Sequence, residues 1–104
     1  MAVAFAWASV YFNGTITNSN NVEAVNHIAT GQYQVTFKSD TFDDTPNIQA
    51  TAMTGIPGQA EINAVATVDA SGSAITMCTV RTRRAMTGAD VDVPFRILAV
   101  GTAR

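Results

Sequence analysis

The stretch that decides the fold is Gln32-Tyr33-Gln34-Val35-Thr36-Phe37-Lys38, in which polar and apolar side chains alternate strictly. In an extended chain, Tyr33, Val35 and Phe37 fall on one side and the polar residues fall on the other. A strand with this pattern belongs to a sheet that has one dry face and one wet face. Similar alternation recurs through the chain, which predicts an all-β protein.

The composition and the spacing of turn signals support this class. Leucine and lysine, which favour helices, occur once each, whereas threonine, which suits a pleated surface, occurs fourteen times. Strands are expected at about 2–12, 15–17, 22–28, 32–38, 47–54, 61–68, 73–82 and 91–100, with turn signals at 13–14, 30–31, 55–58 and 69–72. We therefore expect a single domain over 1–104, an antiparallel β-sandwich of about six to eight short strands.

The low charge of the chain bears on its partners. Charged residues make up only 13% of the sequence, about half of the usual share of roughly 25%. A small domain normally needs charge to stay soluble and monomeric, so the shortage suggests a homo-oligomer that buries part of its surface. A surface kept wet by Thr, Ser, Asn and Gln is the alternative. The net charge of −2 argues against nucleic acid as a partner, because phosphate binding needs clustered lysine and arginine.

The apolar stretch 1–10 is interpreted as a strand. It lacks the positive region of a signal peptide and is shorter than the roughly 20 residues that span a bilayer, so neither secretion nor membrane insertion is expected. Its side chains alternate, with one face made of Ala2, Ala4, Ala6 and Ala8 and the other of Val3, Phe5 and Trp7. The alanine stripe allows close approach, either of sheet to sheet or of subunit to subunit.

No catalytic constellation is present in the sequence. His27 is the only histidine, which removes multi-histidine metal sites and favours a hydrogen-bonded structural role at a strand end. The single Cys78 excludes an internal disulfide and is expected to be a buried, inert thiol. We predict no enzyme, no cofactor and no metal site, since an enzyme would need a cleft that holds His27 near a carboxylate.

Three polar clusters are candidates for ligand binding. They are a predicted polar loop with Asn18, Asn20 and Asn21, an acidic loop with Asp40, Asp43 and Asp44, and a basic cluster of Arg81, Arg83 and Arg84. The aspartates could bind calcium, but their spacing is not that of an EF-hand and favours a solvated loop. The arginines could grip an anionic sugar or phosphate, or pair with Asp90 and Asp92, and we favour the pairing.

Aromatic residues near the N-terminus offer another binding chemistry. Trp7 and Tyr11 could stack on a sugar ring, because their amphipathic rings present an apolar face and a polar edge. Their place on a strand whose other face is alanine favours packing in the core or against another subunit.

Three stretches together resemble the distal domains of bacteriophage tail fibres. They are Val10-Tyr11-Phe12-Asn13-Gly14-Thr15, the stretch from His27 to Phe37, and the apolar strand from Phe95 to Gly101. Fibre domains of this kind often carry an aromatic-Asn-Gly-Thr opening, a Thr-Gly-x-Tyr-x-Val-x-Phe strand and a short apolar strand near the C-terminus. The resemblance implies a homotrimer that binds host-surface glycans, located on the virion.

A weaker similarity points to H-type lectins, which are also compact trimeric sandwiches. It rests on 42–48 and on 97–101, and none of that family's sugar-binding residues maps onto this sequence. The leading functional expectation is a non-enzymatic receptor- or carbohydrate-binding module of the fibre-tip type, using loops at one end of the sandwich. The alternative is a structural or assembly protein of a virion or similar particle, with protein partners only.

Overall fold

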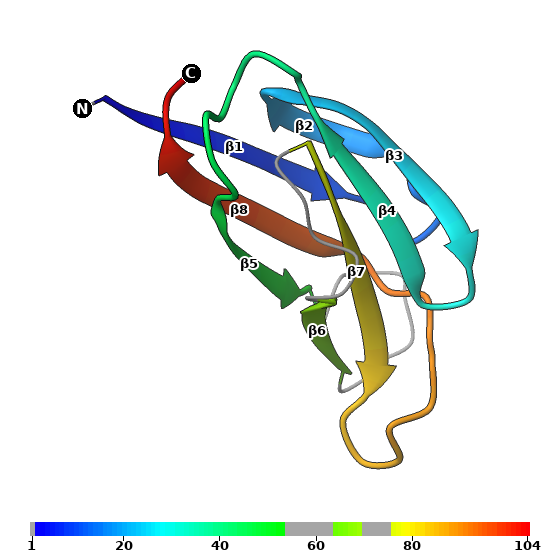
Figure 1. Ribbon diagram of the computed structural model, residues 1–104. Coiled ribbons are helices and arrows are strands. Elements are labelled where there is room, and N and C mark those ends of the chain that lie inside the picture. Colours follow the sequence, from blue (N-terminus) through cyan, green and yellow to red (C-terminus); the bar gives the residue numbers. More distant parts are fainter. Residues whose placement is uncertain (1, 54–63, 70–75) are drawn as a thin grey trace.

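The computed structural model describes residues 2–53, 64–69 and 76–104 (Figure 1). Within these residues the chain forms strands and no helix. The strands are β1 (Val3–Val10), β2 (Ile16–Asn20), β3 (Val22–Ala29), β4 (Gln32–Phe37), β5 (Asn47–Ala52), β6 (Ala64–Asp69), β7 (Met77–Arg84) and β8 (Phe95–Thr102). The predicted all-β class is confirmed. In the described part of the chain, no helix has the length and apolarity needed to cross a membrane.

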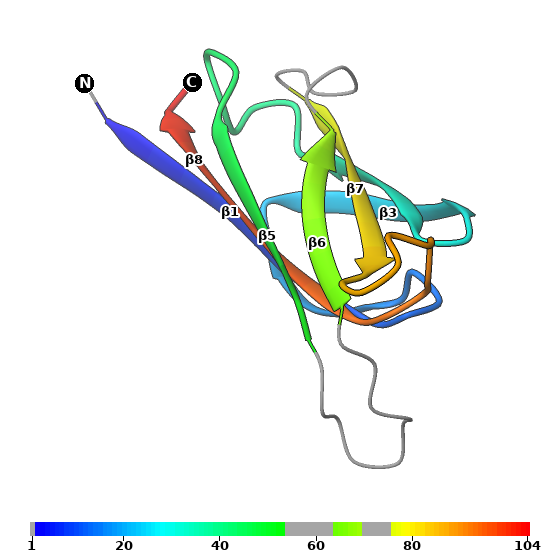
Figure 2. The same ribbon diagram turned by 90° about the horizontal axis from the view of Figure 1, so that it is seen from below.

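The strands form two four-stranded sheets that pack face to face as a β-sandwich (Figure 2). Sheet A has the order β2-β1-β8-β5 and sheet B has the order β3-β4-β7-β6. Every neighbouring pair is antiparallel. The first and last strands, β1 and β8, pair at the centre of sheet A, so the two ends of the chain lie close together (Figure 1).

A single residue, Asn21, separates β2 in sheet A from β3 in sheet B. Its φ of 59° is left-handed, a conformation that asparagine tolerates better than most residues. Its side-chain Nδ2 donates a hydrogen bond to the Phe5 carbonyl oxygen at 2.8 Å, which ties the corner to β1. The expectation of a polar loop over 18–21 is therefore wrong, because backbone pairing with β1 draws Asn18 and Asn20 into a strand.

The core lies between the two sheets and is built from their inward-facing side chains. Its buried members are Ala6, Ala8, Val10, Val22, Tyr33, Val35, Phe37, Phe42, Cys78, Val80, Phe95, Ile97 and Ala99. Ala6 and Ala8 are 0% and 1% exposed, so the alanine stripe serves the approach of sheet to sheet, one of the two uses expected for it. The same alternation leaves Val3, Phe5 and Trp7 on the outer side of sheet A.

The turn chemistry read from the sequence is confirmed at the first hairpin. Gly14 has a φ of 89°, and the Asn13 side-chain oxygen accepts a hydrogen bond from the Thr15 backbone N–H at 3.0 Å. The last strand begins at Phe95 rather than at 91, because Pro94 has no N–H to give to a sheet ladder. The turn expected at 55–58, most of that at 69–72, and the starts of the strands expected at 61–68 and 73–82 lie outside the described residues.

Gly31 closes the β3–β4 hairpin against the neighbouring strands. Its φ is 68°, and a Cβ built there would lie 2.5 Å from the Thr82 carbonyl oxygen and 3.0 Å from the Val91 nitrogen. These two backbone atoms are hydrogen-bonded to each other, since the Val91 N–H donates to the Thr82 carbonyl oxygen at 3.1 Å. Only glycine satisfies both the left-handed backbone and this close approach.

We expect Gly31→Ala to lower the free energy of unfolding by about 3 kcal/mol, combining about 1–2 for the left-handed backbone with about 1–3 for the clash. Gly88→Ala is the matched control, because Gly88 has a φ of 72° but no atom within 4 Å of an added Cβ. Urea unfolding of both variants measures the difference, and equal losses would contradict the close-packing argument.

Candidate functional site

The outward face of sheet A is ordered in rows, because β1, β8 and β5 pair without a register shift. The rows are Phe5 with Val100 and Asn47, then Trp7 with Leu98 and Gln49, then Ser9 with Arg96 and Thr51. Toward the start of β1 the face is apolar, with Val3 61% and Phe5 51% exposed. Toward the end of β1 the face becomes polar, with Ser9, Arg96 and Thr51. The two ends of this sheet face therefore differ chemically.

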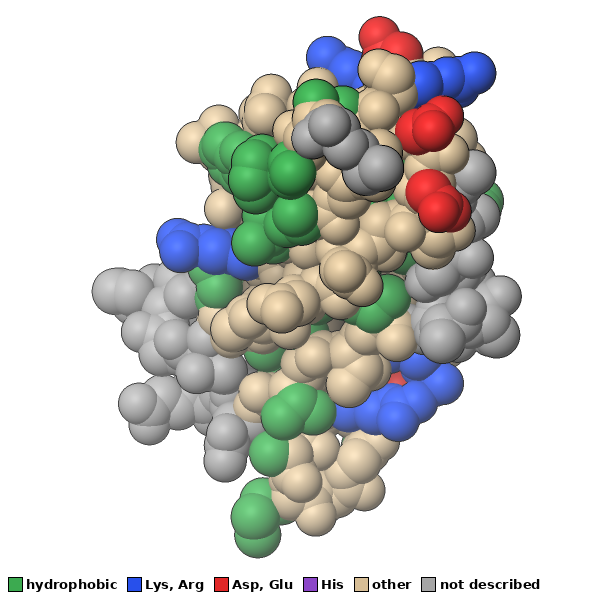
Figure 3. Space-filling model, turned by 60° about the vertical axis from the view of Figure 1, so that its left-hand side comes forward, with side chains coloured by type: hydrophobic (Ala, Val, Ile, Leu, Met, Phe, Trp, Pro, Cys, Tyr) green, Lys and Arg blue, Asp and Glu red, His purple; other side chains and the backbone are tan. Residues whose placement is uncertain are grey.

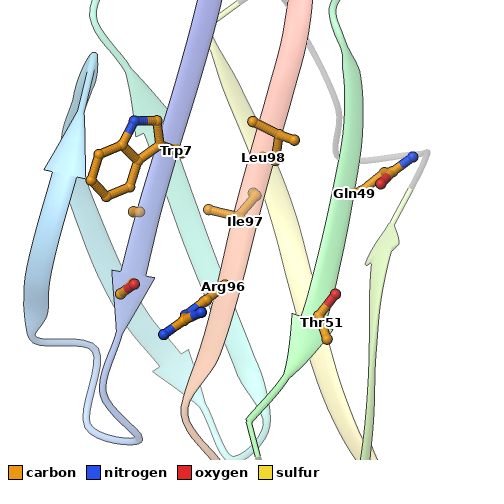
Figure 4. A pocket seen from close by; sticks show the side chains of 8 residues that line it. Trp7, Gln49, Thr51, Arg96, Ile97 and Leu98 are labelled. Carbon is orange, nitrogen blue, oxygen red and sulfur yellow. The ribbon is translucent and has the colours of Figure 1, made fainter.

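A groove of about 260 Å³ lies over the Trp7 and Ser9 rows (Figure 4). It is lined by Trp7, Ala8, Ser9, Gln49, Thr51, Arg96, Ile97 and Leu98. In Figure 4 the Arg96 side chain reaches from β8 toward β1, Trp7 stands beside β1, and Gln49 and Thr51 project from β5. The residues thus come from three adjacent strands, and the sheet itself forms the floor.

The lining residues are suited to binding a small polar ring. The Trp7 indole is half-buried and offers a flat apolar surface, and Leu98, 41% exposed, stands opposite it across the β1–β8 pair. Gln49, Thr51 and Ser9 offer an amide and two hydroxyls that both donate and accept hydrogen bonds. An apolar platform with a few convergent polar groups is the usual make-up of a small-molecule site.

No His, Cys, Asp, Glu, Lys or Tyr lines the groove, so its Ser9 and Thr51 hydroxyls have no base among the lining side chains. Its only charged side chain is that of Arg96, which stays protonated and has no acceptor atom. Within the bounds of the four strands of sheet A there is no aspartate or glutamate.

Two of the sequence candidates lie beside this groove. Asn18 and Asn20 belong to the edge strand β2, where they pair with Ser9 and Trp7 of β1, so they extend the polar end of the same face. Neither of them lines the groove itself. Asn21 is set apart, because its side chain holds the corner between the sheets.

The three aspartates lie in the connection between β4 and β5. Asp40, Asp43 and Asp44 are all exposed, and an Asp44 carboxylate oxygen accepts a hydrogen bond from the Thr45 backbone N–H at 2.8 Å. Among the described residues, no group of three or more His, Cys, Asp or Glu side chains is placed to hold a metal ion. These residues do not converge on the groove.

The arginine cluster lies at the opposite end of the sandwich from the aspartates, because Arg81 pairs with the first residue of β4 whereas the acidic connection follows the last. Arg81 Nη2 and Arg83 Nε lie 3.4 and 3.7 Å from the same Asp90 carboxylate oxygen. The predicted pairing with Asp90 is confirmed, whereas pairing with Asp92 is wrong. Arg84 is exposed at the end of β7.

The candidate binding residues were expected in loops at one end of the sandwich. This placement is wrong, since Asn18, Asn20 and the arginines belong to strands.

His27 takes part in a polar cluster around Asp92. An Asp92 carboxylate oxygen lies 2.8 Å from His27 Nε2, 2.6 Å from the Gly31 backbone nitrogen and 3.4 Å from the Tyr33 hydroxyl. The His27 ring stacks on Tyr33 with centroids 4.7 Å apart. The predicted hydrogen bonding of His27 is confirmed, and its partner is the Asp92 carboxylate.

Two potential nucleophiles, the Tyr33 hydroxyl and the Cys78 thiol, have raised pKa values. Burial, followed by the charge of Asp92, raises the pKa of the Tyr33 hydroxyl, which also donates to the Phe12 carbonyl oxygen. Burial raises the pKa of the Cys78 thiol to about 12, so this thiol stays protonated at neutral pH. The prediction of a buried thiol is confirmed.

Sequence reasoning named Trp7 but missed the groove. The signal was partly present, because Arg96 interrupts the otherwise apolar closing strand on the outward side. What the sequence lacked was the partner of that strand, since only the β1–β8 pairing brings Arg96 next to Ser9.

Comparison of the chain with family models, with curated proteins and with solved structures gave no match.

We expect Asp92→Ala to lower the free energy of unfolding by about 2 kcal/mol, because it leaves the buried Gly31 N–H without its acceptor, at a cost of about 1–3 kcal/mol. Asp90→Ala is the matched control and should cost at most about 1 kcal/mol, since it removes only exposed ion pairs. Thermal and urea unfolding measure both. A loss at position 90 equal to that at position 92 would count against the cluster as an anchor of the fold.

Proposed function

We propose that the chain is a non-enzymatic carbohydrate-binding module whose binding site is the groove on sheet A. The observation that carries this proposal is the Trp7 indole, which stands on the outer face of the sheet in the row next to Ser9, Arg96 and Thr51. Indole rings suit the apolar faces of sugars, and the neighbouring amide and hydroxyls suit their hydroxyl groups. The resemblance to phage fibre tips supports the same class of function.

The sheet face supports binding in a second way, because it holds these side chains on a rigid backbone. Trp7, Leu98 and Gln49 sit on strands paired on the same row, so little ordering is needed when a ligand binds. Glycoside hydrolysis normally uses a pair of carboxylates, and the strands that form the groove carry none. This absence favours binding over cleavage.

We expect Trp7→Ala to weaken binding of a soluble mono- or disaccharide ligand by about tenfold or more, since truncating a central aromatic typically costs about 2 kcal/mol or more. A glycan array finds the ligand, and titration calorimetry with a monovalent sugar measures the loss. Phe12→Ala is the matched control, because Phe12 is an aromatic residue, 38% exposed, that does not line the groove. Silence of the wild-type protein on the array and in cell-binding assays would count against the function.

We further propose that the module works as a homotrimer, with a second copy of the chain over the apolar end of sheet A. Val3 and Phe5 are 61% and 51% exposed there on the same side of β1, and adjoining exposed apolar side chains of this kind mark interaction surfaces. Figure 3 shows a patch of hydrophobic side chains exposed on one side of the molecule, with basic side chains beside it. The groove begins at the Trp7 row, next to that of Phe5, so the proposed subunit interface and the proposed sugar site occupy different ends of one face.

Light scattering at micromolar concentration should give a molar mass of about three times the 10.9 kDa chain. Phe5→Glu should shift this mass toward that of the monomer, because a charge buried at an interface without a partner is costly. Val65→Glu is the control, since Val65 is 47% exposed on sheet B. A wild-type molar mass equal to that of the monomer would contradict the trimer. An unchanged molar mass for Phe5→Glu would contradict this interface.

The apolar end of sheet A also favours a second function, a structural or assembly protein of a virion or similar particle. In that case Val3 and Phe5 would contact a different protein, and the chain would have protein partners only. Co-purification with a particle, together with no glycan affinity in the wild-type protein, is the result that would favour this function over carbohydrate binding.

A further inference from the structure

We propose that the groove on sheet A takes an acidic sugar, whose carboxylate pairs with the guanidinium of Arg96 while its ring lies on Trp7. This inference rests on the proposed carbohydrate-binding function and names the class of sugar. The ligand recognised would be a glycan that ends in, or exposes, one monosaccharide bearing a carboxylate.

The first argument is the isolation of Arg96 as a charge. It is the only charged residue within the bounds of the four strands of sheet A, in a protein whose net charge is −2. It makes no ion pair with any described residue, whereas Arg81 and Arg83 share Asp90. A guanidinium without an acidic partner among the described residues, on strands that carry no carboxylate, is placed to receive an anion from outside.

The second argument is the geometry of the rows. Arg96 precedes Leu98 by two positions on the same side of β8, which separates them by about 7 Å along the strand. A single sugar ring over the Trp7 row can bridge this span with a carboxylate substituent that points at Arg96. Ser9 and Thr51, which flank Arg96 on the adjacent strands, can hydrogen-bond to the same substituent or to a ring hydroxyl.

The third argument is size. The groove measures about 260 Å³, just under the roughly 300–1,000 Å³ typical of sites for drug-sized ligands. It therefore suits one sugar residue rather than a long chain laid across the sheet. Asn18 and Asn20, on the edge strand beside it, lie where the next residue of a longer glycan would pass.

Arginine fits this task better than lysine because its planar fork matches the two oxygens of a carboxylate. The competing explanation is that Arg96 only keeps an otherwise uncharged sheet face soluble. The two explanations differ in what they require of position 96. A soluble surface needs only a polar or charged side chain there, whereas recognition of a carboxylate needs the guanidinium.

The test compares sugars that differ in a carboxylate, with sialyllactose against lactose and galacturonic acid oligomers against galactose oligomers as probes. We expect the wild-type protein to prefer at least one acidic probe by about tenfold or more, because a charge-assisted hydrogen bond is about that much stronger than none. The preference should shrink as the salt concentration rises. Arg96→Gln should abolish the preference because it removes the positive charge, and Arg96→Lys should keep only part of the preference.

Arg84→Gln is the matched control, since Arg84 is an exposed arginine outside the groove and should leave the preference unchanged. Equal binding of acidic and neutral probes by the wild-type protein would overturn the acidic-sugar inference and leave the carbohydrate-binding function standing. An Arg96→Gln variant that aggregates but keeps the preference would overturn the inference in favour of a solubility role. No binding of any probe would overturn both.

Discussion

The antiparallel pairing of β1 with β8 at the centre of sheet A is the interaction on which both the core and the groove depend. It runs from Val3 opposite Thr102 to Val10 opposite Phe95 without a register shift. This register turns Ala6 and Ala8 inward against sheet B and turns Trp7 outward. A slip by one residue would exchange the two faces, because side chains alternate with a period of two. Core packing and the outer face are therefore fixed together.

A second constraint acts where the chain leaves sheet B for the last strand. Without a disulfide, and with a single cysteine buried in the core, the 91–94 segment is held by the Asp92 carboxylate, which bridges His27 of β3 and the Gly31 turn. Tyr33 completes the cluster and links it to the first hairpin through the Phe12 carbonyl oxygen. Polar contacts of this kind bring together segments more than sixty positions apart in the sequence. They do so at the end of the sandwich away from the acidic connection.

The proposed site lies on a sheet face rather than on loops, and this changes what the fold contributes. Loops offer variety, whereas a paired sheet offers fixed spacing between rows of side chains. Trp7 and Arg96 owe their relative position to adjacent strands of sheet A, so their spacing is set by backbone hydrogen bonds. A site of this kind suits recognition of a small rigid ring, and its selectivity would come from the identity of a few outward side chains.

The sequence by itself determined the class of fold and which side chains of each clearly alternating strand face inward. Alternation in the stretch from Gln32 to Lys38 and around the alanine stripe was enough, because a period of two is a local property of the chain. The role of Asn18 and Asn20 was misread, since their polar side chains predict a loop and only the hydrogen bonds of β1 make them a strand. The groove and the Asp92 cluster were decided by tertiary structure alone. They join residues far apart in the chain, and strand order, which no local pattern encodes, is what sets them side by side.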